Sequence, residues 1–453
     1  MFVDRAGELE ALDAAYRARP GLVVVYGRRR VGKTRLVLEW ARRSGAPYIY
    51  YHAVPAEHEV NLRGLGDAAA ESLGLGFLRR TRFDTLDALL DAIASVRPDA
   101  VVVLDEFTYW MRGEPRAAGE LQRFIDHRLP GTRMLVVLVG SLLGVMLRDV
   151  LGSGAPLYGR ARLRLRVEPL KPWYTPAFHP WLSLEDQARV YGLFGGIPFY
   201  HTLVPREASL REIVGKLVAS PHSPLRDELL FTLRDELQNP APYYSVMEAI
   251  ARGYTRLSEI SGYTGIAVQH LPRYISTLEM LGLVERVVPL GSKRGWYRIR
   301  DPIARTWFRI VEPLLPLIEA GSIEQATSRA LERLENVMGE VFEEIAFEYV
   351  RYLASRGEVT YTRLGKWARK GVEIDIIAVD EEKRLVHAFE AKWAELDEAD
   401  ARRIASRLEA KLSETPYRGW EHRLHIVCRS YRGKKPREVE VHTLADMPFQ
   451  ERG

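Results

Sequence analysis

The sequence predicts an α/β protein built around a parallel sheet, and three stretches of the chain carry this prediction. Residues 22–41 read as a buried strand, a glycine-containing loop and a helix. Residues 101–107 form an apolar run that ends in two acids, as a buried parallel strand does when it delivers carboxylates to its C-terminal edge. Residues 372–393 alternate apolar and charged positions, which predicts paired strands near the C-terminus.

The length and composition indicate a globular protein with several domains. The chain has 453 residues, which corresponds to about three domains at ~150 residues each. A hydrophobic content of 47% and a charged content of 28% are ordinary for a protein with real cores. The net charge of +5 permits nucleic-acid binding without requiring it.

Cysteine usage and the apolar runs exclude several classes of protein. Cys428 is the single cysteine, so a disulfide framework within the chain and a cysteine-based zinc site are both excluded. The N-terminus has no signal-peptide core, and no run approaches the ~20 apolar residues of a membrane span. We therefore expect a cytoplasmic protein that binds no membrane.

The loop at residues 27–34 predicts an ATP–Mg²⁺ site. It reads Gly-Arg-Arg-Arg-Val-Gly-Lys-Thr, which fits the phosphate-loop pattern G-x-x-x-x-G-K-S/T at every fixed position. Its glycines let the backbone N–H groups approach an anion, Lys33 would reach the β- and γ-phosphates, and Thr34 would hold Mg²⁺. The predicted nucleotide-binding residues are Gly27, Arg28, Arg29, Arg30, Val31, Gly32, Lys33, Thr34 and Arg35.

Two further strands end in polar side chains at the same predicted edge. Asp105 is expected in the Mg²⁺ shell and Glu106 is expected to polarise the attacking water, the alternative being a solvated acidic turn. The strand at 134–140 ends at Ser141, which would either sense the γ-phosphate or cap a helix at 142–147. Both readings of Ser141 stay open at this point.

Four motifs together resemble the archaeal-type ATPases of the STAND/AAA+ group. They are the N-terminal Phe-x-x-Arg-x-x-Glu-Leu, the phosphate loop, Leu-Asp-Glu-Phe at 104–107 and Pro-Leu-Tyr-Gly-Arg at 156–160. The resemblance implies that Arg160 contacts the γ-phosphate or acts as an arginine finger, the alternative being a surface arginine beside a glycine. It also implies an ATPase core at 1–180 and a helical lid at 181–240.

Residues 241–315 read as three helices and two strands, the pattern of a winged helix-turn-helix. The third helix, at 267–281, would present Gln269 and Arg273 to DNA, and the wing at 289–295 would present Lys293 and Arg294. Modules of this kind also serve as lids or protein-contact domains in such ATPases. DNA contact and protein contact therefore both stay open.

Residues 330–453 are expected to form an α/β domain with a metal site. Strand periodicity places Asp375 on one face of the strand at 372–379, and places Glu390 and Lys392 on one face of the strand at 385–393. Paired strands would join two carboxylates, which bind Mg²⁺ or Mn²⁺, with an ammonium that positions water or offsets developing charge. That is the chemistry of phosphodiester hydrolysis, and the alternative is a hairpin with a solvated charged face.

This pattern resembles the PD-(D/E)xK nuclease fold, in the variant that follows archaeal-type ATPases as a C-terminal domain of unknown function. The matching positions are Asp375, Glu390 and Lys392. The resemblance implies that Glu343, in a helix at 337–353, is a further metal ligand, and that a helix at 398–412 and a strand at 424–428 follow. Glu-Ile-Asp at 373–375 replaces the name-giving Pro-Asp, and the fold alone does not establish cleavage.

The expected function is ATP hydrolysis coupled to DNA binding, with metal-dependent DNA cleavage at the C-terminal site left open. One alternative is a STAND-type signalling switch, in which ATP binding changes the oligomeric state. The other is a nucleotide-regulated DNA-binding regulator whose nuclease fold is inactive. ATP and DNA are the expected partners, assembly into a homo-oligomer is left open, and the sequence fixes neither the DNA substrate nor the trigger.

Overall fold

The computed structural model describes residues 2–450, and the chain divides into two compact units. The N-terminal unit runs to Pro169 and also includes Ile197–Phe199 and Asp235–Gln238. The C-terminal unit consists of Leu170–Gly196, Tyr200–Arg234 and the chain from Asn239 onward. The predicted segments 181–240 and 241–315 are not separate compact units, so the finer division into four domains stays a prediction.

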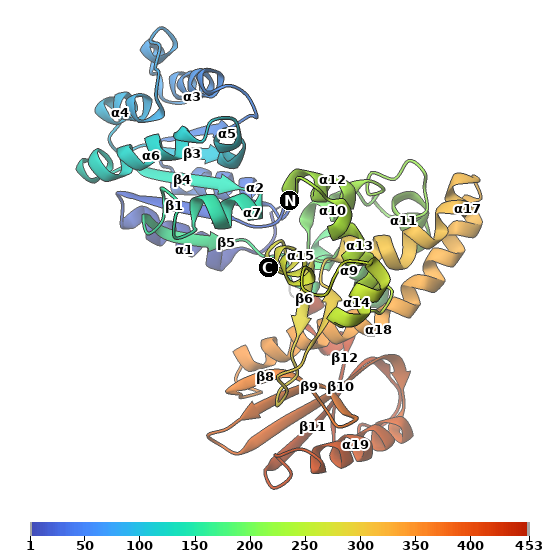
Figure 1. Cartoon of the computed structure of the whole chain (residues 1–453). Coiled ribbons are helices and arrows are strands. Elements are labelled where there is room, and N and C mark those ends of the chain that lie inside the picture. The colour runs from blue at the N-terminus through green and yellow to red at the C-terminus, as the bar shows by residue number, and fades with distance from the viewer. Residues whose placement is uncertain (1, 451–453) are drawn as a thin grey trace. The chain divides into compact units, whose positions relative to one another are not determined.

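The N-terminal unit is built on a five-stranded, fully parallel sheet with the order β2-β3-β4-β1-β5 (Figure 1). β3 and β4 are buried along their whole length, as strands covered on both faces must be. The predicted parallel α/β sheet is thereby confirmed. The strands are β1 (Gly21–Tyr26), β2 (Tyr48–His52), β3 (Val101–Asp105), β4 (Leu135–Gly140) and β5 (Ala161–Arg166).

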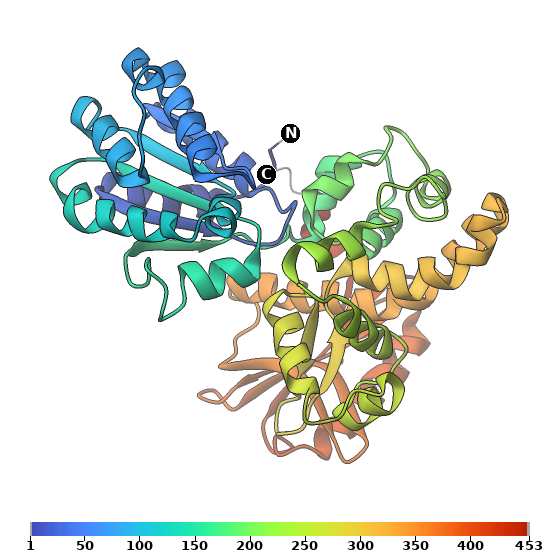
Figure 2. The ribbon, with the colours of Figure 1, turned by 45° about the horizontal axis from the view of Figure 1, so that its top comes forward.

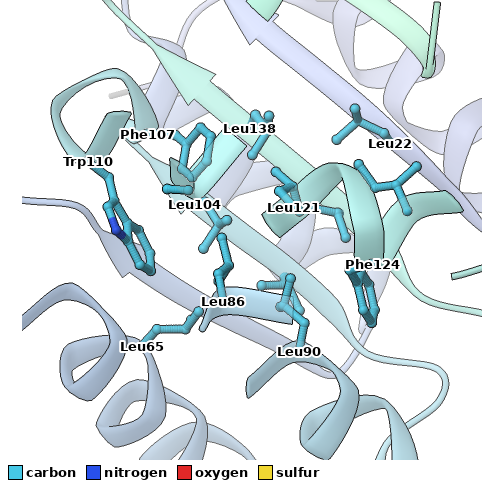
Figure 3. Close-up of a cluster of buried hydrophobic side chains, with 14 of the residues drawn as sticks. Leu22, Leu65, Leu86, Leu90, Leu104, Phe107, Trp110, Leu121, Phe124 and Leu138 are labelled. Carbon is cyan, nitrogen blue, oxygen red and sulfur yellow. The ribbon is translucent and has the colours of Figure 1, made fainter. Parts of the chain in front are cut away.

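Helices cover both faces of this sheet (Figure 2). Successive strand residues alternate between the two faces and so contribute to two separate apolar clusters. On β1, Leu22 and Val24 pack against α3 to α6, whereas Val23 and Val25 pack against α1 and α2. Figure 3 shows part of the first cluster. The helices are α1 (Ala6–Arg17), α2 (Lys33–Ser44), α3 (His58–Leu73), α4 (Leu86–Val96), α5 (Phe107–Gly113), α6 (Arg116–His127) and α7 (Leu143–Val145).

The C-terminal unit contains a mixed five-stranded sheet with the order β12-β11-β10-β9-β8. β8, β9 and β10 are antiparallel, whereas β10, β11 and β12 are parallel. β9, β10 and β11 lie where the sequence predicts strands, and β8 and β12 lie where it predicts none. The bounds are β8 (Arg363–Arg369), β9 (Val372–Asp380), β10 (Leu385–Leu396), β11 (Glu421–Tyr431) and β12 (Glu440–Thr443).

One long helix, α18 (Ile323–Ser355), corrects the predicted helix start at 337, and the predicted domain start at 330, which falls inside this helix, stays a prediction. Ala326, Ala330 and Leu334 extend its buried stripe toward the N-terminus, and no glycine or proline lies between Ile323 and Gly339. The other helices are α8 (Thr175–Phe178), α9 (Leu184–Phe194), α10 (Pro198–Thr202), α11 (Leu210–Leu217), α12 (Glu228–Glu236), α16 (Pro302–Thr306), α17 (Leu315–Glu319) and α19 (Glu398–Ser413).

Three helices and a two-stranded antiparallel sheet occupy residues 241–299. The loop after the first strand of this sheet does not stand free: the Leu290 N–H donates a hydrogen bond to the Lys366 carbonyl at 2.8 Å, and Leu290 pairs with Trp367 of β8. This small sheet is thus anchored on the larger one. The elements are α13 (Ala241–Ala251), α14 (Leu257–Thr264), α15 (Leu271–Met280), β6 (Val284–Val287) and β7 (Trp296–Ile299).

Truncating Phe124 should destabilise the N-terminal unit. Its ring is fully buried in the apolar cluster to which α4, α6 and the sheet contribute, so Phe124→Ala leaves a cavity and should cost about 3–5 kcal/mol of unfolding free energy. Urea unfolding of the full chain measures this as a lower midpoint. Phe77→Ala is the matched control, because that ring is 45% exposed and its loss should change the midpoint little. Equal midpoints for the two variants would contradict the described packing.

Candidate functional site

The phosphate loop joins β1 to α2 in a conformation that few residues tolerate. A Cβ on Gly27 would lie 2.4 Å from the Val167 carbonyl oxygen, so no side chain fits there. Gly32 has φ +96°, and Arg30, although not a glycine, has φ +67°. A left-handed arginine is a strained state that persists only where its surroundings fix it. The loop is therefore held in shape before any ligand binds.

Lys33 closes this loop on itself. Its Nζ donates to the carbonyl oxygens of Gly27 at 3.0 Å and Arg28 at 2.9 Å. Burial lowers the pKa of the Lys33 ammonium to about 8, although the nearby charges of Glu106 and Asp105 oppose that shift. A phosphate group entering the loop would offer this ammonium a stronger acceptor than the two carbonyls do.

Asp105 gathers hydroxyl groups at the end of β3. Its Oδ2 accepts hydrogen bonds from Thr34 Oγ1 at 2.7 Å and from the Tyr50 hydroxyl at 2.7 Å, and it lies 3.6 Å from His52 Nδ1. The Thr34 and Asp105 oxygens are as close as neighbouring ligands of Mg²⁺ at bond lengths of about 2.1 Å. This oxygen pair therefore fits the predicted Mg²⁺ site.

Glu106 and Ser141 form one hydrogen-bonded pair. Glu106 is left-handed, with φ +51°, and its Oε2 accepts from the Ser141 N–H at 3.1 Å and from the Ser141 hydroxyl at 2.8 Å. Leu142, not Ser141, precedes α7, and no side chain of the flanking residue caps this helix. The helix-cap reading of Ser141 is therefore wrong, and its γ-phosphate contact stays a prediction.

A distant acidic segment completes the N-terminal site. Asp235 forms an ion pair with Arg29 of the phosphate loop, and its carbonyl accepts from Arg112 at 3.0 Å. The Glu236 carboxylate accepts from the Leu143 N–H at 2.9 Å and the Gly144 N–H at 3.2 Å, so it caps α7. Burial raises the pKa of Glu236 to about 7, against the effect of these two hydrogen bonds.

Loop arginines and an N-terminal arginine hold the phosphate loop from other sides. The Arg30 guanidinium lies over the Phe199 ring, 4.2 Å from its centroid. Buried Arg5 pairs with Glu8 at 2.8 Å and donates to the Val31 carbonyl at 3.2 Å. Arg28 is partly buried, Val31 is buried and Arg35 is exposed.

In the C-terminal unit, Lys392 joins the two predicted metal-binding carboxylates. Its Nζ lies 2.9 Å from Glu390 Oε1 and 3.8 Å from Asp375 Oδ2. These two oxygens are therefore at most 6.7 Å apart (2.9 plus 3.8 Å), whereas two oxygens that share one ion with bonds of about 2.1 Å must lie within about 4.2 Å of each other. The Ala391 N–H also donates to Asp375 Oδ2, at 2.9 Å, and so fixes that carboxylate.

Two other lysines and Glu343 surround this pair. Lys411 of α19 contacts Glu390 at 2.9 Å, and Lys366 of β8 contacts Glu343 at 3.2 Å. Burial and then the charge of Glu390 raise the pKa of Asp375, and burial and then Asp375 raise that of Glu343. Although burial opposes it, the hydrogen bonds and charges of Lys392 and Lys411 lower the pKa of Glu390.

The predicted set of three carboxylates does not converge. A metal site of three ligands needs three side-chain ligand atoms that lie close to one another. Within residues 2–450, one group of histidines, cysteines or acids has its ligand atoms within 4.8 Å of one another, and it contains none of Asp375, Glu390 and Glu343. Glu343 lies on α18 and is held by Lys366. A shared ion at Asp375 and Glu390 stays a prediction, and Glu343 would have to move to join it.

The four predicted DNA contacts are exposed, two on each part of the small module. The helix α15 begins at Leu271 and not at the predicted residue 267, so Gln269 lies in the turn before it and Arg273 in its first turn. Lys293 and Arg294 lie in the loop between β6 and β7. Among residues 2–450, no carboxylate forms an ion pair with Arg273, Lys293 or Arg294. Their contact with DNA stays a prediction.

Comparison with known families covers both sites. Residues 2–203 match a family model described as an ATPase domain predominantly from Archaea, and these residues include the whole phosphate loop, Asp105 and Glu106. This part of the chain is an ATPase domain. Residues 307–404 match a family described as archaeal and bacterial proteins of unknown function, and they include Glu343, Asp375, Glu390 and Lys392.

Two individual proteins are similar to larger parts of the chain. An uncharacterized protein of Methanocaldococcus jannaschii is 28% identical over 98% of this chain and 100% of its own length. A Walker-type ATPase of Pyrococcus abyssi is 21% identical, with a TM-score of 0.52, over 68% of this chain and 96% of that one. This second similarity shows the P-loop ATPase fold with its parallel sheet. No helix among residues 2–450 is long and apolar enough to cross a membrane.

Arg160 lies at the wrong end of the ATPase domain for its predicted role. Register pairs Leu22 with Ala161 and Tyr26 with Arg166, so Arg160 lies at the start of β5, roughly 13 Å of strand away from the phosphate-loop edge. Its guanidinium binds Asp126 through two hydrogen bonds, at 2.7 and 2.8 Å. A γ-phosphate contact within the same chain is therefore wrong, and a finger supplied to a second copy stays a prediction.

Sequence reasoning missed Tyr50, Asp235, Glu236 and the role of Arg5. Tyr50 offered a signal, because it lies on a strand whose C-terminal end faces the same edge as Asp105. Arg5 belonged to a quoted motif without a stated contact. Asp235 and Glu236 offered no signal in the sequence, because 206 positions separate Asp235 from its partner Arg29.

ATP binding by the ATPase domain should take up a proton at alkaline pH. In the free protein burial lowers the pKa of Lys33 to about 8, whereas a bound triphosphate raises it again by its negative charge. Affinity should therefore fall as pH rises through ~8, because the binding-competent ammonium is lost. Calorimetry with a non-hydrolysable ATP analogue, at about pH 9 in buffers of different ionisation enthalpy, measures the uptake directly.

The control for this titration is Glu236→Gln. This change removes a carboxyl group near the site whose pKa is also shifted, in this case upward. Glu236, with a pKa of about 7, is already ionised at the chosen pH and should contribute little. Proton uptake should persist in Glu236→Gln and disappear in Lys33→Arg, which stays charged throughout. Equal heats in both buffers for the wild type would contradict the assignment to Lys33.

Proposed function

We propose that this ATPase acts on DNA, binding it through residues 241–299 and cutting it in a metal-dependent reaction at Asp375, Glu390 and Lys392. The observation that carries the proposal is the Lys392 ammonium, which contacts both carboxylates at 2.9 and 3.8 Å. Two carboxylates and one lysine on adjacent strands supply what phosphodiester hydrolysis needs: ligands for a hard cation, and a positive charge beside the reacting phosphate.

In the ATPase domain each residue has a separable task. The loop backbone and Lys33 bind the phosphates, and Thr34 and Asp105 would hold Mg²⁺, which neutralises charge on the phosphate oxygens when bound. Glu106, oriented by Ser141 and by its left-handed backbone, would position the attacking water. If Ser141 left Glu106 and donated to the γ-phosphate instead, the site could distinguish ATP from ADP.

At the C-terminal site the electrostatics favour a divalent cation. The pKa values of Asp375 and Glu343 are raised by burial and by neighbouring carboxylates, which means that negative charge is crowded there. A bound Mg²⁺ or Mn²⁺ would relieve this crowding and lower the pKa of a coordinated water. Lys392 would then leave Asp375 and remain with Glu390, close to the scissile phosphate.

The small module and the candidate metal site belong to one compact unit, which favours DNA binding over a pure protein contact. The loop that carries Lys293 and Arg294 is anchored on β8 through Leu290 and Lys366. The Lys366 side chain in turn contacts Glu343 at 3.2 Å and Glu373 at 2.9 Å. Among residues 2–450, no carboxylate forms an ion pair with Lys293 or Arg294 in this loop, and Lys366, which is paired with two carboxylates, links its anchor point to the acids.

DNA cleavage tests the central claim. The wild-type chain should nick or linearise supercoiled DNA with Mn²⁺ or Mg²⁺, and Asp375→Ala should lose at least ~100-fold of that activity while ATP turnover is unchanged. Glu106→Gln should bind ATP and turn it over slowly, and comparison with and without ATP measures the coupling. Asp380→Ala, on the same strand but paired with Thr360 and Lys383, is the matched control.

Two results would contradict this proposal in different ways. Cleavage that survives both Asp375→Ala and Lys392→Ala would move the activity elsewhere. Absence of cleavage by the wild type, with salt-dependent DNA binding intact, would favour the nucleotide-regulated DNA-binding regulator instead. Absence of both, with ATP-dependent assembly, would favour the STAND-type switch.

The DNA-binding step has its own test. Arg273→Ala with Lys293→Ala should weaken binding and reduce the slope of log affinity against log salt by roughly 0.9 for each phosphate that the protein no longer neutralises. Fluorescence anisotropy with a labelled duplex over a salt titration measures both quantities. Arg206→Ala removes an exposed arginine of the same unit and should leave the slope unchanged. An identical slope in the double variant would assign the module to protein contact.

A further inference from the structure

A second cluster of ligand-forming side chains lies on β11 and β12, the two strands at one edge of the C-terminal sheet. Register places His425 beside Glu440, and the two-residue period puts Glu440 and His442 on one face. His425 Nδ1 lies 3.3 Å from His442 Nε2 and 3.5 Å from Glu440 Oε2, and the last two atoms are 3.9 Å apart. Within residues 2–450 this is the group whose ligand atoms converge within 4.8 Å.

The spacing of these three atoms matches the coordination radius of a transition metal. A circle through three points with these separations has a radius of about 2.1 Å. Zinc binds imidazole nitrogen at about 2.0–2.1 Å and carboxylate oxygen at about 2.0–2.2 Å. An ion close to the plane of the three atoms would therefore reach all of them without movement of any side chain.

Both imidazoles also have the outer partners that metal-binding histidines require. His425 Nε2 lies 2.9 Å from Nδ1 of His387, which is itself buried, and His442 Nδ1 lies 3.3 Å from the Tyr349 hydroxyl. When the inward nitrogens bind a metal, the outward N–H groups donate to these partners and fix the ring orientation. The outer contacts thus point the free lone pairs of both rings at one place.

We propose that His425, Glu440 and His442 bind one divalent transition-metal ion, with Zn²⁺ as the ion they suit best. Two imidazoles and one carboxylate are ligands of zinc, whereas Mg²⁺ prefers oxygen alone. Three protein ligands leave a fourth position, and it faces the open side, because the Glu440 side chain is 62% exposed and the His425 side chain only 2%. A water molecule would occupy this open position.

This site is separate from the acidic site proposed above. His387 and Glu390 are three residues apart on β10, so strand alternation places them on opposite faces. The proposed ion would join β12, which has four residues, to the longer β11 and so fasten a short edge strand. We therefore assign the ion a structural task, and it supplies no step of the proposed cleavage.

Zinc binding by the full chain tests the assignment. After treatment with a chelator, the wild type should bind one high-affinity Zn²⁺ per chain in a competition titration against a chromophoric chelator, and its thermal midpoint should rise with Zn²⁺. Glu440→Gln should weaken binding at least ~10-fold, and Tyr349→Phe, which removes an outer partner, by roughly 10-fold. Glu440 is exposed, so its replacement should not disturb folding.

Two controls separate this site from others in the chain. Glu438→Gln removes an exposed carboxylate two positions away and should bind Zn²⁺ as the wild type does. Asp375→Ala should also keep the high-affinity ion, which excludes the acidic site as its location. X-ray absorption should show nitrogen and oxygen ligands without sulfur, because the only thiol, Cys428, is buried and bonded to the His442 carbonyl.

Either of two outcomes would overturn the proposal. If the wild type binds no Zn²⁺ above the level of Glu440→Gln, the cluster is a chain of hydrogen bonds in which His442 Nε2–H donates to His425 Nδ1. If Glu440→Gln and His442→Ala both retain wild-type affinity and stoichiometry, the ion lies elsewhere. Circular dichroism of each variant establishes that the comparison is made between folded proteins.

Discussion

The buried carboxylate of Asp105 is the constraint on which the ATPase domain depends. Only 1% of the residue is exposed, and an ionised group is costly to bury unless it is hydrogen-bonded. The bonds come from Thr34 at the start of α2, from Tyr50 on β2 and from the Glu106 N–H. One side chain therefore ties the phosphate loop to two strands of the sheet, and the oxygens it gathers are those that a hard cation would use.

The sequence predicted the parts of this site that are local, and missed those that depend on distant pairing. A fixed motif and an apolar strand ending in acids were enough to locate Lys33, Thr34, Asp105 and Glu106. Asp235 and Glu236 carry no local pattern, because their partners lie in the phosphate loop and at α7. The predicted role of Arg160 was wrong for the complementary reason. A motif identifies residues that occur together in a family, whereas the register of the strands decides at which edge of the sheet each residue lies.

The C-terminal unit shows the same division at two sites of different chemistry. Alternation predicted that Glu390 and Lys392 share a face, but Lys366 and Lys411 reach the acids from β8 and α19. Those lysines matter, because they compensate carboxylates that burial would otherwise push toward protonation. The histidines on β11 and β12 gave no spaced motif, since β12 was not predicted and its register against β11 brings them together.

The anchored loop between β6 and β7 gives the proposed DNA path a mechanical basis. Gly291 has φ +78°, and a Cβ there would lie 2.8 Å from the Trp367 ring, so the loop is pressed against β8. We therefore expect a ligand that shifts this loop to shift β8 as well, and the residue before Trp367 on that strand, Lys366, contacts Glu343 and Glu373. The contact between Gly291 and Trp367, together with β8, would thus be enough to couple the loop between β6 and β7 to Glu343 and Glu373. Since Glu343 must leave Lys366 to join Asp375 at an ion, displacement of β8 is the movement that would release it.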